Sequence, residues 1–190
     1  LNQLHTIEDY NNDPAKAASA CAGLRLFVDQ EIVLIVGAGG YSSIPLALDA
    51  MAKWIISETG LVTISVTDKI DLNGVINLNH TYGHRIQIIG AGSGQILQVT
   101  QTETYNFNIF ECSNGCKFKL IDNLTIIGTS PNNQGTYCAV LADQGAQLTL
   151  GANMYIGDTS VVEGYVARGF YIGVKATNGG VIQALSLIHI

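Results

Sequence analysis

SNGCKFKLIDNLTIIG, residues Ser113–Gly128, contains two short stretches in which apolar and polar residues alternate, joined by a small polar corner. Phe118 and Leu120 alternate with polar neighbours in the first stretch, and Leu124 and Ile126 do so in the second. A period of two residues is typical of a β-strand with one buried face. The segment therefore predicts two consecutive strands, with Phe118 and Leu120 facing the same core.

This pattern returns twice further along the chain. DQGAQLTLGANMYIG (Asp143–Gly157) has the same order of polar residue, glycine, strand, corner and strand, and its leading Gly145 follows Gly115 by 30 residues. A third start, TNGGVIQAL (Thr177–Leu185), follows 34 residues later. Each start is preceded by another short strand, so a repeat holds about three strands. Such units cannot bury their apolar faces alone, whereas stacking gives one continuous core. The sequence predicts an all-β solenoid, a parallel β-helix.

One helix is expected before the repeats, in IVLIVGAGGYSSIPLALDAMAKW (Ile32–Trp54). Ser42 or Ser43 can cap it, Pro45 fits its first turn, and the sequence predicts that it ends near Thr59-Gly60. Its apolar face comprises Ile44, Leu48, Met51 and Ile55. Because a solenoid has an open apolar end, we expect this helix to cap the N-terminal end of the stack.

The strand–glycine–helix order also resembles the start of a dinucleotide-binding fold. Gly37 and Gly39 fit the G-x-G-x-x-G fingerprint, but Ser42 stands at the third glycine position and the candidate acid, Asp68, comes 31 residues after Gly37. No further crossover helices follow, as that fold requires. The pattern therefore favours a capping role for the helix, and no cofactor is expected.

The predicted organisation has four parts: a lead-in over 1–31, a strand and capping helix over 32–60, β-helix coils over 61–184 and an atypical tail over 185–190. Within the lead-in, Asp13 can cap a short helix and Leu24–Val28 reads as a strand. Two interpretations of the tail, LSLIHI, stay open: an ordinary apolar strand, or translated sequencing-adapter read-through. We expect the chain to be a fragment.

Composition narrows the classes of partner. The formal net charge of −6 argues against nucleic acid, because domains that bind phosphate backbones are usually basic. No apolar run approaches the roughly 20 residues of a membrane span, so no membrane partner is expected. The four cysteines (Cys21, Cys112, Cys116 and Cys138) lack metal-ligand spacing, so no metal is expected. They read as buried thiols, with a Cys112–Cys116 disulfide left open.

Several segments carry a family likeness. GAGGYSSIPLALDAM, LVTISVTDKIDL and HRIQIIGAG together resemble the start of pectin-lyase-like right-handed parallel β-helices. YCAVLADQGAQLTL and GFYIGVKATNGGVIQAL are similar to coils of bacteriophage tail-fibre and tailspike proteins. The resemblance covers roughly Glu31–Ala184.

The resemblance implies a right-handed helix and a homotrimeric adsorption protein of the virion tail. Such a protein would be joined to other tail proteins and would contact a bacterial surface polysaccharide. Some members of this group only bind the glycan, whereas others cut it. The expected function is therefore a structural module for glycan recognition, and the alternative is a depolymerase, viral or secreted, that acts as a polysaccharide lyase or glycoside hydrolase.

Candidate catalytic residues follow from these chemistries. Glycoside hydrolysis needs two carboxylates, and the pair selected from the coils is Asp158 and Glu163, with Arg168 nearby. The alternative for corner acids such as Asp122 and Asp158 is a turn role in which the carboxylate binds local backbone N–H groups.

A lyase would instead need a base and a cation that neutralises the uronate. His84 and Arg85, in NHTYGHR with His80, are the predicted substrate-binding residues. The alternative is that this segment is only a polar turn between strands.

Overall fold

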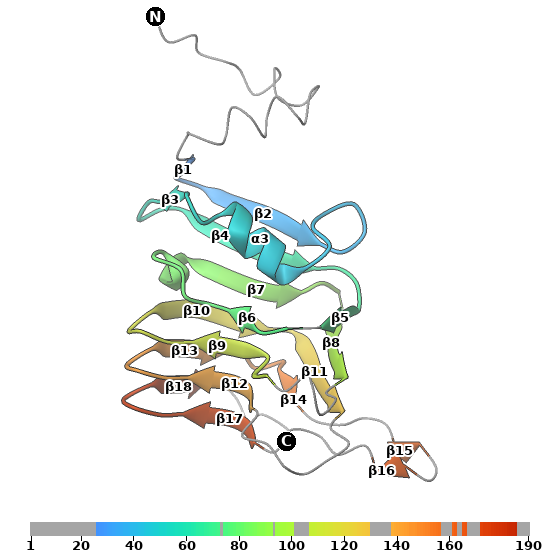
Figure 1. The fold of residues 1–190 in the computed structure, drawn as a ribbon. Helices are drawn as coiled ribbons and strands as arrows, with labels where there is room; N and C mark the ends of the chain where they lie inside the picture. Colours follow the sequence, from blue (N-terminus) through green and yellow to red (C-terminus); the bar gives the residue numbers. More distant parts are fainter. Residues whose placement is uncertain are drawn as a thin grey trace, which may run out of the picture.

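A computed structural model of the chain describes residues 26–72, 74–92, 94–100, 107–129, 138–156, 161–162, 165–166 and 172–185. These residues form a parallel β-solenoid of about four turns, in which the chain passes repeatedly through three sheets (Figure 1). The predicted solenoid is confirmed.

All strand pairs within the three sheets are parallel. Sheet 1 contains β2 (Glu31–Val36), β4 (Leu61–Val66), β7 (Ile86–Gly90), β10 (Lys117–Asp122), β13 (Gln147–Leu150) and β18 (Val181–Ala184). Sheet 2 contains β5 (Ile70–Leu72), β8 (Gln95–Thr100), β11 (Leu124–Thr129) and β14 (Tyr155–Ile156). Sheet 3 contains β6 (Ile76–Asn77), β9 (Phe110–Cys112), β12 (Cys138–Ala142) and β17 (Ile172–Ala176).

Apolar side chains of successive turns stack into ladders inside the solenoid. One ladder in sheet 1 runs in register through Leu34, Ile64, Ile88, Ile121 and Leu150, and all but the first are fully buried. Each fully buried side chain of this size contributes roughly 1.5–3 kcal/mol relative to an exposed one. The aligned repeats therefore form the core that the sequence predicted.

The position of Leu120 differs from the prediction. A register shift between β10 and β13, lying between Phe118 and Ile121, places Lys119 and Leu120 opposite the single residue Thr149. This β-bulge turns Ile121 inward in place of Leu120, which is only half-buried. Strict alternation through Leu120 is wrong for this strand.

Helix α3 (Ile44–Ala50) is shorter than predicted. Ser43 caps it as expected, because its Oγ accepts a hydrogen bond from the Leu46 N–H (3.4 Å). The predicted end near Thr59-Gly60 is wrong, because Ile55 and Ile56 form strand β3 and pair with β1 (Phe27–Val28). Strand pairing with a segment distant in sequence overrides the helical periodicity that Ile55 completes.

The helix lies at the N-terminal end of the described solenoid, against β2, β4 and β6 (Figure 1). Its Ile44, Ala47 and Met51 side chains are fully buried, so its apolar face adds to the same core. The helix has seven residues, and within the described ranges no helix is long and apolar enough to span a bilayer.

The glycines before α3 form a tight turn against β2. Gly37 and Gly39 have φ values of 130° and 81°, which favour glycine, and a Cβ at Gly40 would overlap the Ile35 carbonyl. The Ala38 N–H donates a hydrogen bond to the Asp68 carboxylate. This amide is thus paired within the protein, and the glycines turn the chain from β2 into α3, as predicted.

Two further elements complete the description. Strands β15 (Val161–Val162) and β16 (Tyr165–Val166) form an antiparallel pair between β14 and β17. Of the predicted lead-in strand, Phe27–Val28 is observed as β1; the helix expected after Asp13 and the tail from residue 186 lie outside the described residues.

Candidate ligand-binding groove

A short 3-10 helix, η1 (Gly83–Arg85), positions the predicted substrate-binding pair beside β10. A Cβ on Gly83 would overlap the carbonyl oxygen of Lys117, so glycine lets η1 approach the β10 backbone closely. His84, the next residue of η1, lines the same groove as Lys117. The turn alternative is correct for the backbone, and the turn also places His84 at a groove.

The two predicted residues have different roles. The Arg85 guanidinium donates a hydrogen bond to the carbonyl oxygen of Glu58. This contact ties Arg85 to the segment before β4, whereas His84 lines the groove and is exposed. In the same segment, the His80 Nε2 lies 3.0 Å from the Met51 carbonyl oxygen. This contact connects the segment before η1 to the C-terminal end of α3.

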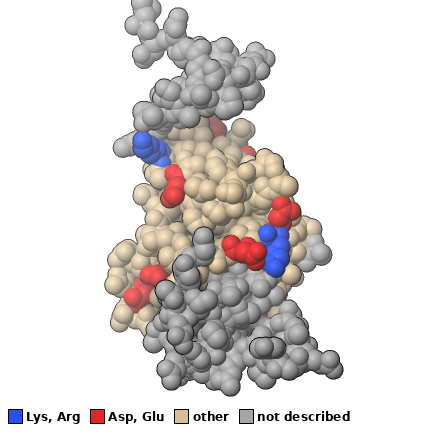
Figure 2. All heavy atoms as spheres, turned by 45° about the vertical axis from the view of Figure 1, so that its right-hand side comes forward, with Lys and Arg blue, Asp and Glu red and all other residues tan. Residues whose placement is uncertain are grey.

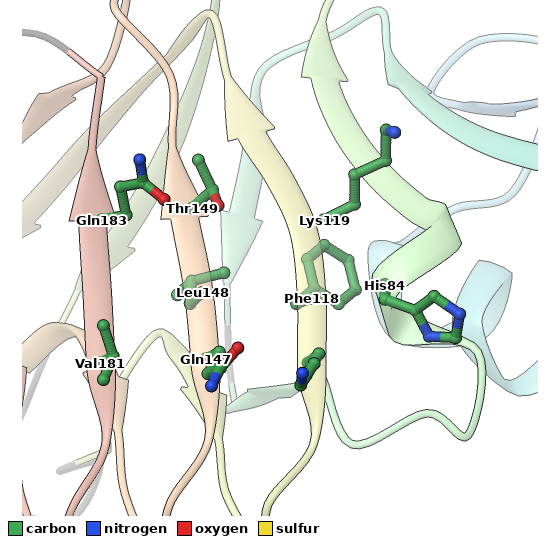
Figure 3. A pocket seen from close by; sticks show the side chains of 9 residues that line it. His84, Phe118, Lys119, Gln147, Leu148, Thr149, Val181 and Gln183 are labelled. Carbon is green, nitrogen blue, oxygen red and sulfur yellow. The ribbon is translucent and has the colours of Figure 1, made fainter.

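The groove follows the outer face of sheet 1 across β10, β13 and β18, with η1 at one side (Figure 3). Its volume is about 290 Å³. Its outward-facing polar side chains stand in register: Lys117 is beside Gln147, and Thr149 is beside Gln183. The bulge in β10 sits at the same place and presents Lys119 opposite Thr149. The full lining is His84, Lys117, Phe118, Lys119, Gln147, Leu148, Thr149, Val181 and Gln183.

The groove is cationic, although the chain carries a net charge of −6. Partial desolvation of the exposed His84 ring lowers its pKa, and the positive charges of Arg85, Lys117 and Lys119 lower it further. In the part of the chain that the structure describes, neither lysine forms an ion pair. On the face drawn in Figure 2, the Lys, Arg, Asp and Glu side chains lie in a few separate places. The positive charge of the groove thus comes from Lys117 and Lys119, beside an imidazole that their charges help to keep neutral.

Two acids at the corners of the solenoid accept hydrogen bonds within the protein. Asp122 binds its own local backbone, as the turn alternative predicted, and both acids also bind groups of the following turn. The Asp122 Oδ1 accepts the N–H groups of Asn123 (2.8 Å) and Asn153 (2.9 Å). The Asp143 Oδ1 accepts from Thr177 Oγ1 and Asn178 Nδ2, both at 2.8 Å. These bonds assign both carboxylates to the corners.

The predicted catalytic trio of Asp158, Glu163 and Arg168 lies outside the described residues, so its geometry stays a prediction. Among the described ranges, no group of three or more His, Cys, Asp or Glu side chains is arranged to hold a metal ion.

The open question about the cysteines has an answer. Cys112 and Cys116 carry free thiols, and the Cys112 Sγ lies 3.6 Å from the Cys116 carbonyl oxygen. Burial raises the pKa of Cys112 to about 12, and Cys116 adds to this effect. A thiol of this kind is unreactive at neutral pH and packs as a small apolar group.

Sequence reasoning identified His84 and missed the rest of the groove. Lys117, Lys119, Gln147, Thr149 and Gln183 are the polar positions of KFKL, QLTL and VIQA, the strands that open the three aligned repeats. Stacking the repeats places these positions side by side, so the alignment held the signal.

Comparison of the chain with protein-family models, with curated proteins and with solved structures finds no match in any of the three.

Proposed function

We propose that this chain is a solenoid module that recognises a bacterial surface polysaccharide, as part of a bacteriophage tail fibre or tailspike. The observation that supports it is the groove on sheet 1, where amide, hydroxyl and cationic side chains stand on three neighbouring strands. The family likeness of the sequence supplies the remaining parts of the proposal: a homotrimer, a place in the virion tail and contact with other tail proteins.

Sheet geometry suits an extended polymer. Neighbouring strands lie about 4.8 Å apart and alternate residues of a strand about 6.7 Å apart, so the outward side chains form a regular grid. Sugar hydroxyls are donors and acceptors at once, and Gln147, Thr149 and Gln183 offer both kinds of partner. Side chains held on strands are also positioned more firmly than side chains on loops.

The test is binding of the purified chain to immobilised bacterial capsular polysaccharides and O-antigens, measured by biolayer interferometry. We expect binding to at least one polysaccharide, weakened at least fivefold in the variant T149A/Q183A. The matched control, T125A on β11 of sheet 2, should bind as wild type does. The absence of binding to every surface polysaccharide would overturn the proposal.

A depolymerase is the second candidate, favoured by one feature of the groove. His84, whose pKa is lowered, lines it together with Lys117. In β-elimination a neutral imidazole can remove the C5 proton of a uronate while a lysine stabilises the charge that develops on the carboxylate. The C4–O bond then breaks as the C4–C5 double bond forms, and the leaving glycosidic oxygen takes a proton from water or from the imidazolium. A bound polysaccharide that shortens with wild type but not with H84Q supports a lyase; loss of cleavage only in D158N or E163Q supports a hydrolase.

A further inference from the structure

We propose that the groove between η1 and strands β10, β13 and β18 selects polysaccharides that carry carboxylate groups, with Lys117 and Lys119 binding the carboxylates. The inference deepens the proposed function and rests on it. It names the chemical class of the glycan and assigns the contacts within the groove.

The two lysines have charge available for a ligand. Both side chains are exposed at the groove, and no acid among the described residues pairs with either of them. They face the same side of β10 two residues apart, so their Cα atoms are separated by about 6.7 Å. An ammonium group binds a carboxylate by charge-assisted hydrogen bonds, which are stronger than bonds to a neutral hydroxyl.

No acid lines the groove, and few acids lie near it on the same sheet. The outward-facing residues of β7, β10, β13 and β18 include a single acid, Asp122, and its Oδ1 is held by two backbone N–H groups. Glu31, on β2 of the same sheet, accepts a hydrogen bond from Thr63 Oγ1 (2.8 Å). A carboxylate in the groove therefore meets cations and neutral polar groups.

The remaining groove residues favour a sugar over a simple anion. Gln147, beside Lys117, and the Thr149–Gln183 pair extend the polar surface across two further strands. They can bind hydroxyls of the same polymer whose carboxylates contact the lysines.

The experiment compares matched polymers on the full chain. Polygalacturonate, alginate and polysialic acid are used beside their carboxyl-reduced neutral forms, with single-stranded DNA as a non-sugar polyanion. We expect an acidic glycan to bind at least tenfold more tightly than its reduced form, and binding to weaken as salt rises. In K117Q/K119Q the preference should fall at least tenfold, whereas K69Q/K175Q, which removes equal charge elsewhere, should keep it.

A second readout follows His84 directly. Its ring resonances should shift when an acidic glycan binds, and its apparent pKa should rise, because a carboxylate placed beside Lys117 stabilises the imidazolium.

The outcomes separate the inference from the proposed function. Equal binding of acidic and reduced glycans, binding only of neutral surface polysaccharides, or equal binding of DNA would overturn carboxylate selection and leave glycan recognition standing. Unchanged acidic-glycan binding by K117Q/K119Q would overturn the assignment of the groove. Failure of every polysaccharide, acidic or neutral, would overturn both.

Discussion

The carboxyl group of Asp122 occupies the space that a Cβ would need at Gly151, in the following turn of the solenoid. The Gly151 N–H donates to the Ile121 carbonyl oxygen (2.8 Å), and Asp122 accepts the Asn153 N–H (2.9 Å). These contacts join two turns at the corner between sheets 1 and 2. A glycine in one repeat is thus required by an aspartate in another.

Gly151→Ala is therefore expected to destabilise the protein by about 1–3 kcal/mol, because the new methyl group must displace the carboxyl group and its hydrogen bonds. Urea unfolding followed by circular dichroism measures the change. Gly74→Ala is the matched control: a Cβ there meets no described atom within 4 Å, and the change should be neutral or slightly stabilising. Equal effects at the two glycines would contradict this account of the corner.

Two residues with positive φ should respond to glycine in opposite ways. Asn123 (φ 55°) donates its amide to the carbonyl oxygens of Gly90 (2.6 Å) and Gly92 (3.1 Å), so Asn123→Gly keeps the backbone but loses both bonds. We expect Asn123→Gly to lower the free energy of unfolding by about 1–2 kcal/mol. Gln144 (φ 51°) is exposed, so Gln144→Gly should stabilise by up to about 1 kcal/mol through relief of backbone strain. Thermal unfolding of both variants tests the contrast.

The stacked architecture could be predicted because each repeat carries its own strand and corner signals. The alignment placed Phe118 with Leu148 and Ile182, and these residues are in register. The bulge that exposes part of Leu120 could not be predicted, since it depends on how β10 fits between β7 and β13. Pairing of Ile55 with Phe27 is equally non-local.

The same limit applies to the groove. His84 could be found from its own segment, because histidine, arginine and glycine cluster there. Lys117 and Lys119 become neighbours of His84 only through the register of β7 with β10 and the close approach at Gly83. Each lysine alone reads as an ordinary solvated position on a strand. The groove residues thus become neighbours only when the turns of the solenoid stack, and no single segment of the sequence shows this.

Asp143 should make stability depend on pH in the acid range. Hydrogen bonds from Thr177, then from Asn178, hold its pKa below the ordinary value. Its contribution is therefore fully present above the unfolded pKa of about 3.8 and is lost as the pH falls through the folded value. Melting temperatures between pH 5 and 2.5 should fall less steeply in D143N. T177V should narrow the pH range over which stability is lost, because it removes one of the hydrogen bonds that lower the pKa of Asp143. If the melting temperature of D143N fell as steeply with pH as that of the wild type, Asp143 would not be the cause of the acid dependence.

Cys112 should report unfolding by its reactivity. Its side chain is fully buried and its pKa is about 12, so almost no thiolate is present at pH 8. Iodoacetamide is expected to modify native Cys112 at least roughly a hundredfold more slowly than the unfolded chain in urea. Mass spectrometry of peptides identifies the site. Rapid native modification of Cys112 would show that the corner near Cys116 opens readily.

His84 should also make the stability of the protein depend on pH, for a different reason from Asp143. The fold disfavours the charged form of His84, whereas it favours the charged form of Asp143. Burial is the first cause of its lowered pKa, and the charges of Arg85, Lys117 and Lys119 follow. The unfolded chain therefore binds a proton near pH 6.5 that the folded chain binds only at lower pH. Stability from this group is complete above pH 6.5 and decreases as the pH falls toward the folded value, with no further loss below it. H84Q should remove this decrease, and K117Q/K119Q should shrink it without abolishing it, because burial remains. Melting curves between pH 7.5 and 5 distinguish the cases. A decrease in K117Q/K119Q as large as in the wild type would mean that the charges of the two lysines do not act on His84. The lysines and His84 would then not form one binding site, and the proposed preference of the groove for carboxylates depends on their doing so.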